Sequence, residues 1–455
     1  MATTASVSPA RACAYAVVRR VFEQGAYADR AFHAQARGLD HRERSFAMAL
    51  AYGTVQRKAT LDHVIERLSD RPVSRLDPPV LAALRLGLMQ LLLLDGVAEH
   101  AAVHESVQLA KLHAPGGSGL VNAVLRRAGR EGRAIVDGLH DRTPADAAVK
   151  HSVPVWLAEL WWRELGAERA RSLLAAVNRP AESAVRANTL LTPDVAALAA
   201  DLGVASHPAP DLPEGLVLEA GFDAHGSPQW ERGELMPQSR ASMTVARTLA
   251  PVPGERVLDL CAAPGAKTTH LAALMADSGE LTAVERHEGR ARALRATLER
   301  MRVTSARVEV ADAAEFPAAD ATRGSAGDAS RGPAGDATRG PAADAGYDRV
   351  LVDPPCSGLG TLQSRPDLRW RVAPGQIAEL AAEQLRILRA GAAATRPGGT
   401  LVYSVCTIAR AESTGVIDAF LATDTQWERD AEINLAPDAD GTDGFFIVRL
   451  HRRED

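Results

Sequence analysis

The chain has 455 residues, of which 46% are hydrophobic and 24% are charged, and this balance excludes a disordered or a membrane-embedded protein. Its four cysteines, Cys13, Cys261, Cys356 and Cys406, suit neither a disulfide framework nor a Cys-x-x-Cys zinc site, so we expect a cytoplasmic protein without a metal. The net charge of −5 is unevenly distributed, because the N-terminal part through Arg130 is basic, with 17 Lys and Arg against 11 Asp and Glu. A basic N-terminal part fits an RNA partner or a solvated helical surface.

Residues 9–130 predict a bundle of helices, because apolar side chains recur at spacings of three and four and the breaks fall at Gly25, 77–79 and 115–119. The most apolar segment, residues 81–94, is too short to span a bilayer and contains Arg85, so we expect a buried helix there. The N-terminus has no long apolar run of the kind that a signal peptide needs. We therefore expect no membrane partner.

Three short motifs of this bundle, at residues 42–46, 104–107 and 121–126, resemble a NusB-like RNA-binding domain, which we assign to residues 1–135. The resemblance implies docking to RNA or protein rather than chemistry. The alternative is a helical domain that only supports its neighbour.

Residues 150–232 predict a small α+β domain for RNA binding or linkage. Its tryptophans at 156, 161 and 162 have helical spacing and indicate a helix core rather than a platform for stacked bases. A strand at 185–190 is followed by a helix at 194–202, and we expect Arg186 and Asn188 to be solvated on that strand, with contacts to phosphate or a base as the alternative.

From residue 233 to 455 short apolar strands alternate with helices, which predicts a doubly wound, mostly parallel α/β sheet of the Rossmann-like kind. A last apolar run at 445–450 is expected to be an antiparallel strand next to the sheet edge. Residues 317–346 carry an eight-residue repeat with almost no large apolar side chains, so we expect a disordered surface insertion.

The loop after the first of these strands, residues 261–267, consists of small residues with one glycine and leads into a helix. Such a loop lets a ligand approach the backbone closely, but it has neither the three-glycine dinucleotide pattern nor the spacing of a P-loop. Carboxylates at the ends of later strands are placed to hold a ribose and an adenine, so a nucleoside cofactor without a pyrophosphate cradle, S-adenosylmethionine, is indicated. The expected cofactor residues are Cys261, Ala262, Ala263, Pro264, Gly265, Ala266, Lys267, Glu285, Asp312 and Asp353.

Two strands end in thiols. Residues 350–353 lead through Pro354 and Pro355 to Cys356, and residues 401–405 lead to Cys406, so two strand ends are expected to bring two cysteines to one crevice. From position alone Cys356 is the natural nucleophile. Most free cysteines are small buried side chains without a chemical role, and this is what we expect for Cys13.

Four ordered segments, residues 257–269, 353–360, 365–370 and 403–407, resemble the RNA cytosine-C5 methyltransferases, and with the NusB-like front the chain resembles their RsmB (Sun) branch, which methylates 16S ribosomal RNA. The resemblance implies that Cys406 forms the covalent bond to the base and that Cys356 assists its release. It also implies that Asp353 lies between cofactor and base and that Lys267 orients the site. Candidate phosphate contacts are Arg365, Arg369 and Arg371.

The expected partner is small-subunit ribosomal RNA with a single-stranded or loop cytosine, bound by a monomer. Two other readings stay open. An amino-group methyltransferase also uses Asp-Pro-Pro, but an aromatic residue follows the prolines there, whereas Cys356 follows them here. A non-catalytic RNA-binding factor would keep the basic bundle without needing two thiols and a cofactor loop.

Overall fold

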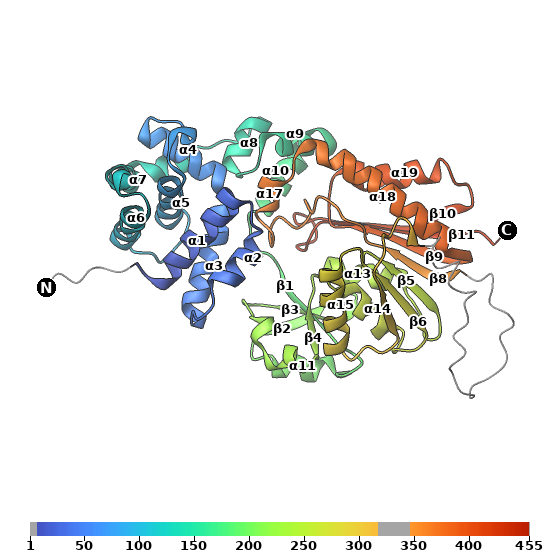
Figure 1. Cartoon of the computed structure of the whole chain (residues 1–455). Helices are drawn as coiled ribbons and strands as arrows, with labels where there is room; N and C mark the ends of the chain where they lie inside the picture. Colours follow the sequence, from blue (N-terminus) through green and yellow to red (C-terminus); the bar gives the residue numbers. More distant parts are fainter. Residues whose placement is uncertain (1–6, 317–345, 455) are drawn as a thin grey trace. The chain divides into compact units, whose positions relative to one another are not determined.

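The computed structural model describes residues 7–316 and 346–454, which form two compact units (Figure 1). Unit 1 consists of the described residues up to Pro180 together with the segment Thr361–Pro374, and unit 2 consists of the remaining described residues. The expected domain boundaries at residues 135, 150 and 232 stay predictions. The predicted repeat insertion lies, apart from Gly346, outside the described residues.

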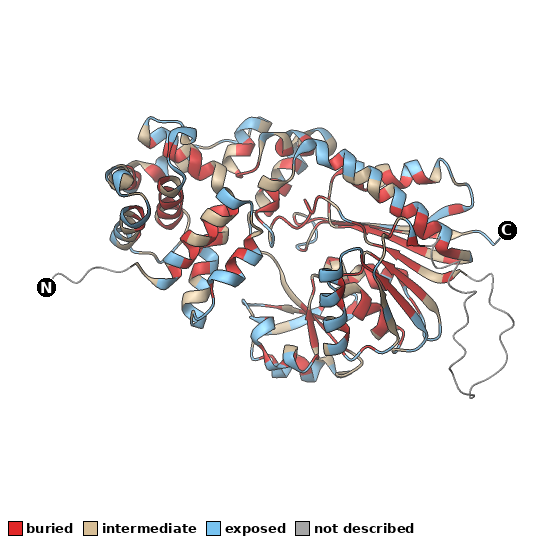
Figure 2. Ribbon diagram, viewed as in Figure 1, coloured by how far each residue is buried: buried red, intermediate tan, exposed pale blue. Residues whose placement is uncertain are grey.

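Unit 1 is helical, as the periodicity predicts. Its core is built from the apolar faces of the first seven helices, and Figure 2 shows these faces as buried. Trp161 is fully buried, which confirms its expected place in a helix core. The helices are α1 Pro9–Gln24, α2 Ala28–Gln35, α3 His41–Gln56, α4 Lys58–Ser69, α5 Pro78–Leu92, α6 Glu99–His113, α7 Ser118–Asp137, α8 Pro144–Lys150, α9 Val155–Leu165, α10 Ala167–Ala176 and α17 Leu368–Arg371.

The segment Thr361–Pro374 completes unit 1, although it comes late in the sequence. Arg369 in α17 is fully buried, and its guanidinium donates hydrogen bonds to the Ser152 and Val177 carbonyls at 3.1 Å. Burial lowers the pKa of Arg369 to about 9. The Trp370 ring donates to the Val55 carbonyl at 2.7 Å. The expectation that Arg369 contacts RNA phosphate is therefore wrong, because the side chain is buried and both of its terminal nitrogens donate to the protein itself.

A small antiparallel sheet opens unit 2, with the strand order β2-β3-β1-β4. Arg186 on β1 is fully buried and donates to Gln238 and Thr269, each at 2.8 Å, while Asn188 donates to the Gly233 and Met301 carbonyls at 2.9 Å. The expectation of solvated side chains is wrong for both, since each ties this sheet to the following domain. The elements are β1 Ser183–Ala187, α11 Val195–Asp201, β2 Ser206–Ala209, β3 Leu212–Leu218, α12 Pro228–Glu231 and β4 Leu235–Pro237.

The large sheet of unit 2 has the order β10-β11-β9-β8-β5-β6-β7, in which the strands from β9 to β7 are parallel and β10 and β11 are antiparallel. This confirms the predicted doubly wound sheet and the antiparallel strand next to its edge. The elements are α13 Arg240–Leu249, β5 Arg256–Leu260, α14 Ala266–Leu274, β6 Glu280–Val284, α15 Glu288–Arg300, β7 Ala306–Glu309, β8 Tyr347–Val352, α18 Pro374–Ala394, β9 Thr395–Val405, α19 Thr414–Leu421, β10 Trp427–Leu435 and β11 Phe445–Arg452.

Helices cover both faces of this sheet. Val257 and Leu351 face the helices α13, α14 and α15, whereas Leu258 and Val350 face α18 and α19. Because both faces are covered, the parallel strands are apolar at consecutive positions, and Figure 2 shows them as the buried centre of the unit. Strand β10 was not predicted, because it lies at the edge and most of its side chains are polar and exposed or half-buried.

Among the described residues no helix is long and apolar enough to cross a membrane, and no group of three or more His, Cys, Asp or Glu side chains is placed to hold a metal ion.

Candidate active site

The site lies at the carboxyl edge of the parallel strands. Because β5, β6, β8 and β9 run in the same direction, the residues that follow them meet at one edge. These residues are the loop after Leu260, the turn from Glu285, the turn from Asp353 and the turn from Cys406. The sequence-predicted site residues are thus brought together by strand topology.

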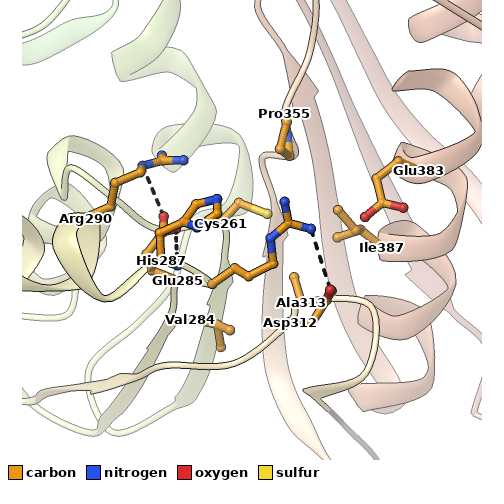
Figure 3. Close-up of a pocket in the computed structure, with 11 residues that line it drawn as sticks. Cys261, Val284, Glu285, His287, Arg290, Asp312, Ala313, Pro355, Glu383 and Ile387 are labelled. Atoms are coloured by element: carbon orange, nitrogen blue, oxygen red, sulfur yellow. Dashed lines mark hydrogen bonds and ion pairs between the residues drawn. The ribbon is translucent and has the colours of Figure 1, made fainter. Parts of the chain in front are cut away.

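A pocket lies between this edge and helix α18 (Figure 3). In Figure 3, Cys261, Glu285 and His287 lie on one side, while Ile387 and Glu383 project from the helix on the other side and Pro355 lies above. Its mixed wall of carboxylates and apolar side chains suits a nucleoside. The pocket is lined by Cys261, Val284, Glu285, Arg286, His287, Arg290, Asp312, Ala313, Pro355, Glu383 and Ile387.

Arg290 on α15 connects two walls of this pocket. Its guanidinium lies 3.3 Å from a carboxylate oxygen of Glu285 and donates a hydrogen bond to the Ala263 carbonyl at 2.7 Å. The other Glu285 oxygen accepts from the His287 backbone N–H at 2.9 Å. Arg290 therefore fixes both the strand-end carboxylate and the loop after β5. Sequence reasoning missed it, because an arginine in an exposed helical turn carries no motif signal.

The loop from Cys261 to Ala266 folds tightly onto helix α14. Gly265 has φ 107°, and a Cβ built on it would lie 2.9 Å from Leu294, so only glycine fits there. Cys261 is a rare non-glycine residue at positive φ, 67°, a conformation that costs about 1 kcal/mol or more and clusters at functional sites. Below the loop, buried Asp259 accepts a hydrogen bond from Thr268 at 2.6 Å, and burial raises its pKa to about 7.

The two thiols are in contact. The sulfur of Cys356 lies 3.3 Å from that of Cys406, although 50 residues separate them. The hydrogen bond between the two sulfurs lowers the pKa of Cys406 and, together with burial, raises the pKa of Cys356. Cys406 is therefore the more acidic thiol of the pair.

Lys267 and Asp353 lie beside the thiols rather than in the wall of the pocket. The Lys267 ammonium pairs with one Asp353 oxygen at 2.8 Å, and the Ser404 hydroxyl donates to the other at 2.9 Å. The charge of Lys267 helps to lower the pKa of Cys406. Ser404 precedes Cys406 by two residues in β9, so this bond ties the β8 turn to the β9 strand.

The expected cofactor residues thus fall into three places. Cys261, Glu285 and Asp312 line the pocket, where Asp312 lies 3.7 Å from the Arg286 guanidinium. Lys267 and Asp353 stand at the thiols, and the loop residues between Cys261 and Lys267 connect the two places. Sequence reasoning gave no role to the buried carboxylate of Glu412, which accepts hydrogen bonds from the turn of each cysteine. Its signal was a single acidic residue six positions after Cys406.

Two family models match the sequence. The model described as 16S rRNA methyltransferase RsmB/F matches residues 246–451, and the NusB family model matches residues 8–130. Both matches confirm the resemblance predicted from the motifs.

Individual proteins match over about two thirds of the chain or more. The probable ribosomal RNA small subunit methyltransferase B of Synechocystis sp. is 34% identical over 468 residues, which cover 97% of this chain and 99% of the relative. The solved structure of PH0851 is similar with a TM-score of 0.79 and 24% identity, covering 98% of this chain and 99% of that chain. NSun6 from Pyrococcus horikoshii, solved with SFG, is similar with a TM-score of 0.56 and 20% identity, and the match covers 66% of this chain and 99% of that chain. The two solved structures show that the fold is shared.

Proposed function

The chain belongs to the RsmB/F family of S-adenosylmethionine-dependent 16S ribosomal RNA methyltransferases, and from this we propose that it methylates C5 of a cytosine in small-subunit ribosomal RNA. We further propose that the reaction passes through a covalent bond between Cys406 and C6 of the base, which is resolved with the help of Cys356. The observation that carries this proposal is the pair of thiols in contact at 3.3 Å.

The chemistry needs a nucleophile because C5 of cytosine does not attack a methyl group by itself. Addition of the Cys406 thiolate to C6 moves the electrons of the C5–C6 double bond to C5, which can then accept the methyl group. An unperturbed thiol has a pKa of about 8.5, and the lowered pKa of Cys406 raises its thiolate fraction at neutral pH. This supports Cys406, rather than Cys356, as the nucleophile.

Release requires the C5 proton to leave. Once Cys406 is bonded to C6, it no longer accepts the hydrogen bond from Cys356, and Cys356 loses its own proton to solvent. The Cys356 thiolate then takes the C5 proton, the electrons of the C5–H bond re-form the C5–C6 double bond, and Cys406 departs as a thiolate. Losing the bond to Cys406 removes the largest cause of the raised pKa of Cys356, so its proton can leave, while burial and the charge of Glu412 still make its thiolate a stronger base than an ordinary one.

We propose that the pocket beside β6 holds S-adenosylmethionine, which supplies an electrophilic methyl group when bound. Glu285 would hold the ribose hydroxyls, and Asp312 would hold the adenine. Apolar Ile387 and Pro355 offer surfaces to the adenine ring. The solved NSun6 structure with SFG, an S-adenosylmethionine analogue, has the same fold and supports this assignment.

Residues 1–135, of which 8–130 match the NusB family, and residues 150–232 are proposed to bind the RNA, with the 233–455 domain carrying the chemistry. The target base must leave its stack to reach two half-buried thiols, at a cost of a few kcal/mol that a single-stranded or loop cytosine lowers. Arg365 is exposed and remains a candidate phosphate contact. A monomer in the cytoplasm stays our prediction.

Methyl transfer from labelled S-adenosylmethionine to unmethylated small-subunit ribosomal RNA tests the proposal. Wild type should form 5-methylcytosine, Cys406→Ala should form none, and Cys356→Ala should accumulate a covalent RNA adduct on a denaturing gel. Undiminished 5-methylcytosine from Cys406→Ala would return the nucleophile to Cys356. No methylation by wild type would favour a binding factor, and methylation of an exocyclic amine would favour the amino-group enzymes.

A further inference from the structure

Glu412 is a fully buried carboxylate that the proposed chemistry does not use. It ends the 3₁₀ turn η4, Arg410–Glu412, which follows β9. Its recorded partners among the described residues are neutral: it accepts hydrogen bonds from the Ser357 backbone N–H at 2.8 Å, from the Ser357 hydroxyl, from Thr407 at 3.1 Å and from Gln384 at 3.0 Å. Burying a carboxylate costs several kcal/mol, so a buried carboxylate whose partners are neutral indicates a role that offsets this cost.

The partners of Glu412 are the neighbours of the two thiols. Ser357 follows Cys356, and Thr407 follows Cys406, so one carboxylate holds the turns of both cysteines. The Ser357 and Thr407 hydroxyls also contact each other at 2.9 Å. This small cluster is a bridge between two turns that are 50 residues apart in sequence.

A second layer of hydrogen bonds holds the carboxylate itself. Gln384 on α18 donates to Glu412 and also to the Pro355 carbonyl at 2.9 Å, and Figure 3 shows Pro355 above the cofactor pocket. The Tyr403 hydroxyl donates to the Glu412 backbone carbonyl at 2.7 Å. Both side chains are buried, so the carboxylate cannot reorient without breaking this layer.

We propose, on the basis of the function proposed above, that Glu412 is a positioning residue that holds the thiols of Cys356 and Cys406 in contact and keeps their shared proton on Cys356. The geometric part follows from the two bonded turns. The electrostatic part follows from its charge, which disfavours a second negative charge on Cys356.

The charges around the pair support this division. Glu412 contributes to the raised pKa of Cys356, after the hydrogen bond to Cys406 and burial. On the other thiol, the hydrogen bond to Cys356 lowers the pKa of Cys406, burial and Asp353 raise it, Lys267 lowers it and Asp443 raises it. Glu412 thus acts on Cys356, whereas the charges that act on Cys406 are Lys267 and two other carboxylates.

Alkylation of the individual thiols in the full chain tests the proposal without RNA or cofactor. The rates at which iodoacetamide modifies Cys406 and Cys356 are measured by mass spectrometry between pH 6 and pH 9, with buried Cys13 as an internal reference. Wild type should be modified faster at Cys406. Glu412→Gln keeps the shape and removes the charge, so the ratio of the Cys406 rate to the Cys356 rate should fall about tenfold at neutral pH, the effect of a one-unit pKa change.

Ser413→Ala is the matched control. Ser413 is buried in the same turn and donates to the Ala409 carbonyl at 3.0 Å, and removing its hydroxyl loosens the turn while the carboxylate stays. Its rate ratio should stay within about twofold of wild type, well below the tenfold effect of a one-unit pKa change. An unchanged ratio in folded Glu412→Gln overturns the proposal. Should that variant not fold, Thr407→Val removes the Thr407 bond to Glu412, and Ser357→Ala removes the bond from the Ser357 hydroxyl while the backbone N–H bond stays. Wild-type ratios in both variants overturn the proposal equally.

Methyl transfer separates this proposal from the one it rests on. Glu412→Gln should lower the turnover rate about tenfold, in step with the loss of thiolate on Cys406, and leave KM for S-adenosylmethionine unchanged, because Glu412 does not line the cofactor pocket. If wild type makes no 5-methylcytosine, the proposed function fails, yet the alkylation ratio still decides whether Glu412 positions the thiols.

Discussion

Arg369 offers the sharpest test of how unit 1 is built. Its guanidinium donates to four backbone carbonyls, including Gln56 at 3.3 Å and Leu362 at 3.1 Å, and to the side chain of Asn178 at 3.0 Å. Replacement by methionine keeps much of the volume and removes all five bonds. A bond to a charged group contributes about 1.5–3 kcal/mol, but the lost charge also removes its own burial cost, so we expect a net destabilisation of about 4 kcal/mol.

Differential scanning calorimetry of the full chain measures this effect. For a unit of this size 1 kcal/mol lowers Tm by about 2–4 °C, so Arg369→Met should lower the transition of unit 1 by about 8–16 °C. Arg365→Met is the matched control from the same segment: Arg365 is exposed, and its loss should lower Tm by less than about 2 °C, as is usual for a surface substitution.

RNA binding at low salt completes the comparison. If Arg365 contacts phosphate, Arg365→Met should weaken RNA binding and lower the magnitude of the slope of log K against log salt concentration by about one, with no change in Tm. The structural account of Arg369 is refuted if Arg369→Met keeps the wild-type Tm and weakens RNA binding instead, because that is the behaviour of a phosphate contact.

Three further predictions concern the site. Arg290→Ala should raise KM for S-adenosylmethionine about tenfold or more, since it loses charge-assisted bonds to Glu285 and the loop, whereas exposed Arg292→Ala should not change KM; equal values for both would contradict the role of Arg290. In Lys267→Met the single-turnover rate should rise at a higher pH than in wild type, because the lost cation no longer lowers the pKa of Cys406. An unchanged pH profile of that rate refutes the coupling between Lys267 and Cys406. Burial raises the pKa of Asp259 in the folded state to about 7, so the folded state binds one proton that the unfolded state has lost. The free energy of unfolding should therefore fall by up to about 4 kcal/mol as pH rises from about 4 to 7. Urea unfolding of the cofactor-free protein should show this fall in wild type but not in Asp259→Asn, and the same pH dependence in both proteins refutes the prediction.

The sequence predicts the fold well where the signals are local. Consecutive apolar residues such as Val350–Val352 indicate a strand covered on both faces, and the small residues after Leu260 indicate a turn where a ligand can approach. The periodic apolar positions of α1 to α7 predict the bundle in the same way. Such patterns depend on neighbours within a few residues, so they survive without knowledge of tertiary contacts.

Burial of charged side chains could not be predicted, because it depends on partners far away in sequence. Arg186 bonds to Thr269, 83 residues later, and Arg369 bonds to Ser152, 217 residues earlier. An arginine beside a recognised motif looks like a phosphate contact, since most arginines are exposed. Glu412 was equally hidden, because its partner Ser357 lies 55 residues before it.

The contact between the thiols follows from the strand order rather than from either motif. β8 and β9 are parallel neighbours, with Val352 opposite Tyr403, so the turns that follow them begin side by side. The Gly360 backbone N–H donates to the Cys406 carbonyl at 3.0 Å, and a Cβ on Gly360 would lie 1.9 Å from the Gly444 carbonyl oxygen. The turn of Cys356 can therefore return to the turn of Cys406 only through a glycine. A two-thiol mechanism is thus available to this sheet because adjacent parallel strands supply one thiol each, and the buried bonds of Glu412 and Gly360 keep those thiols at contact distance.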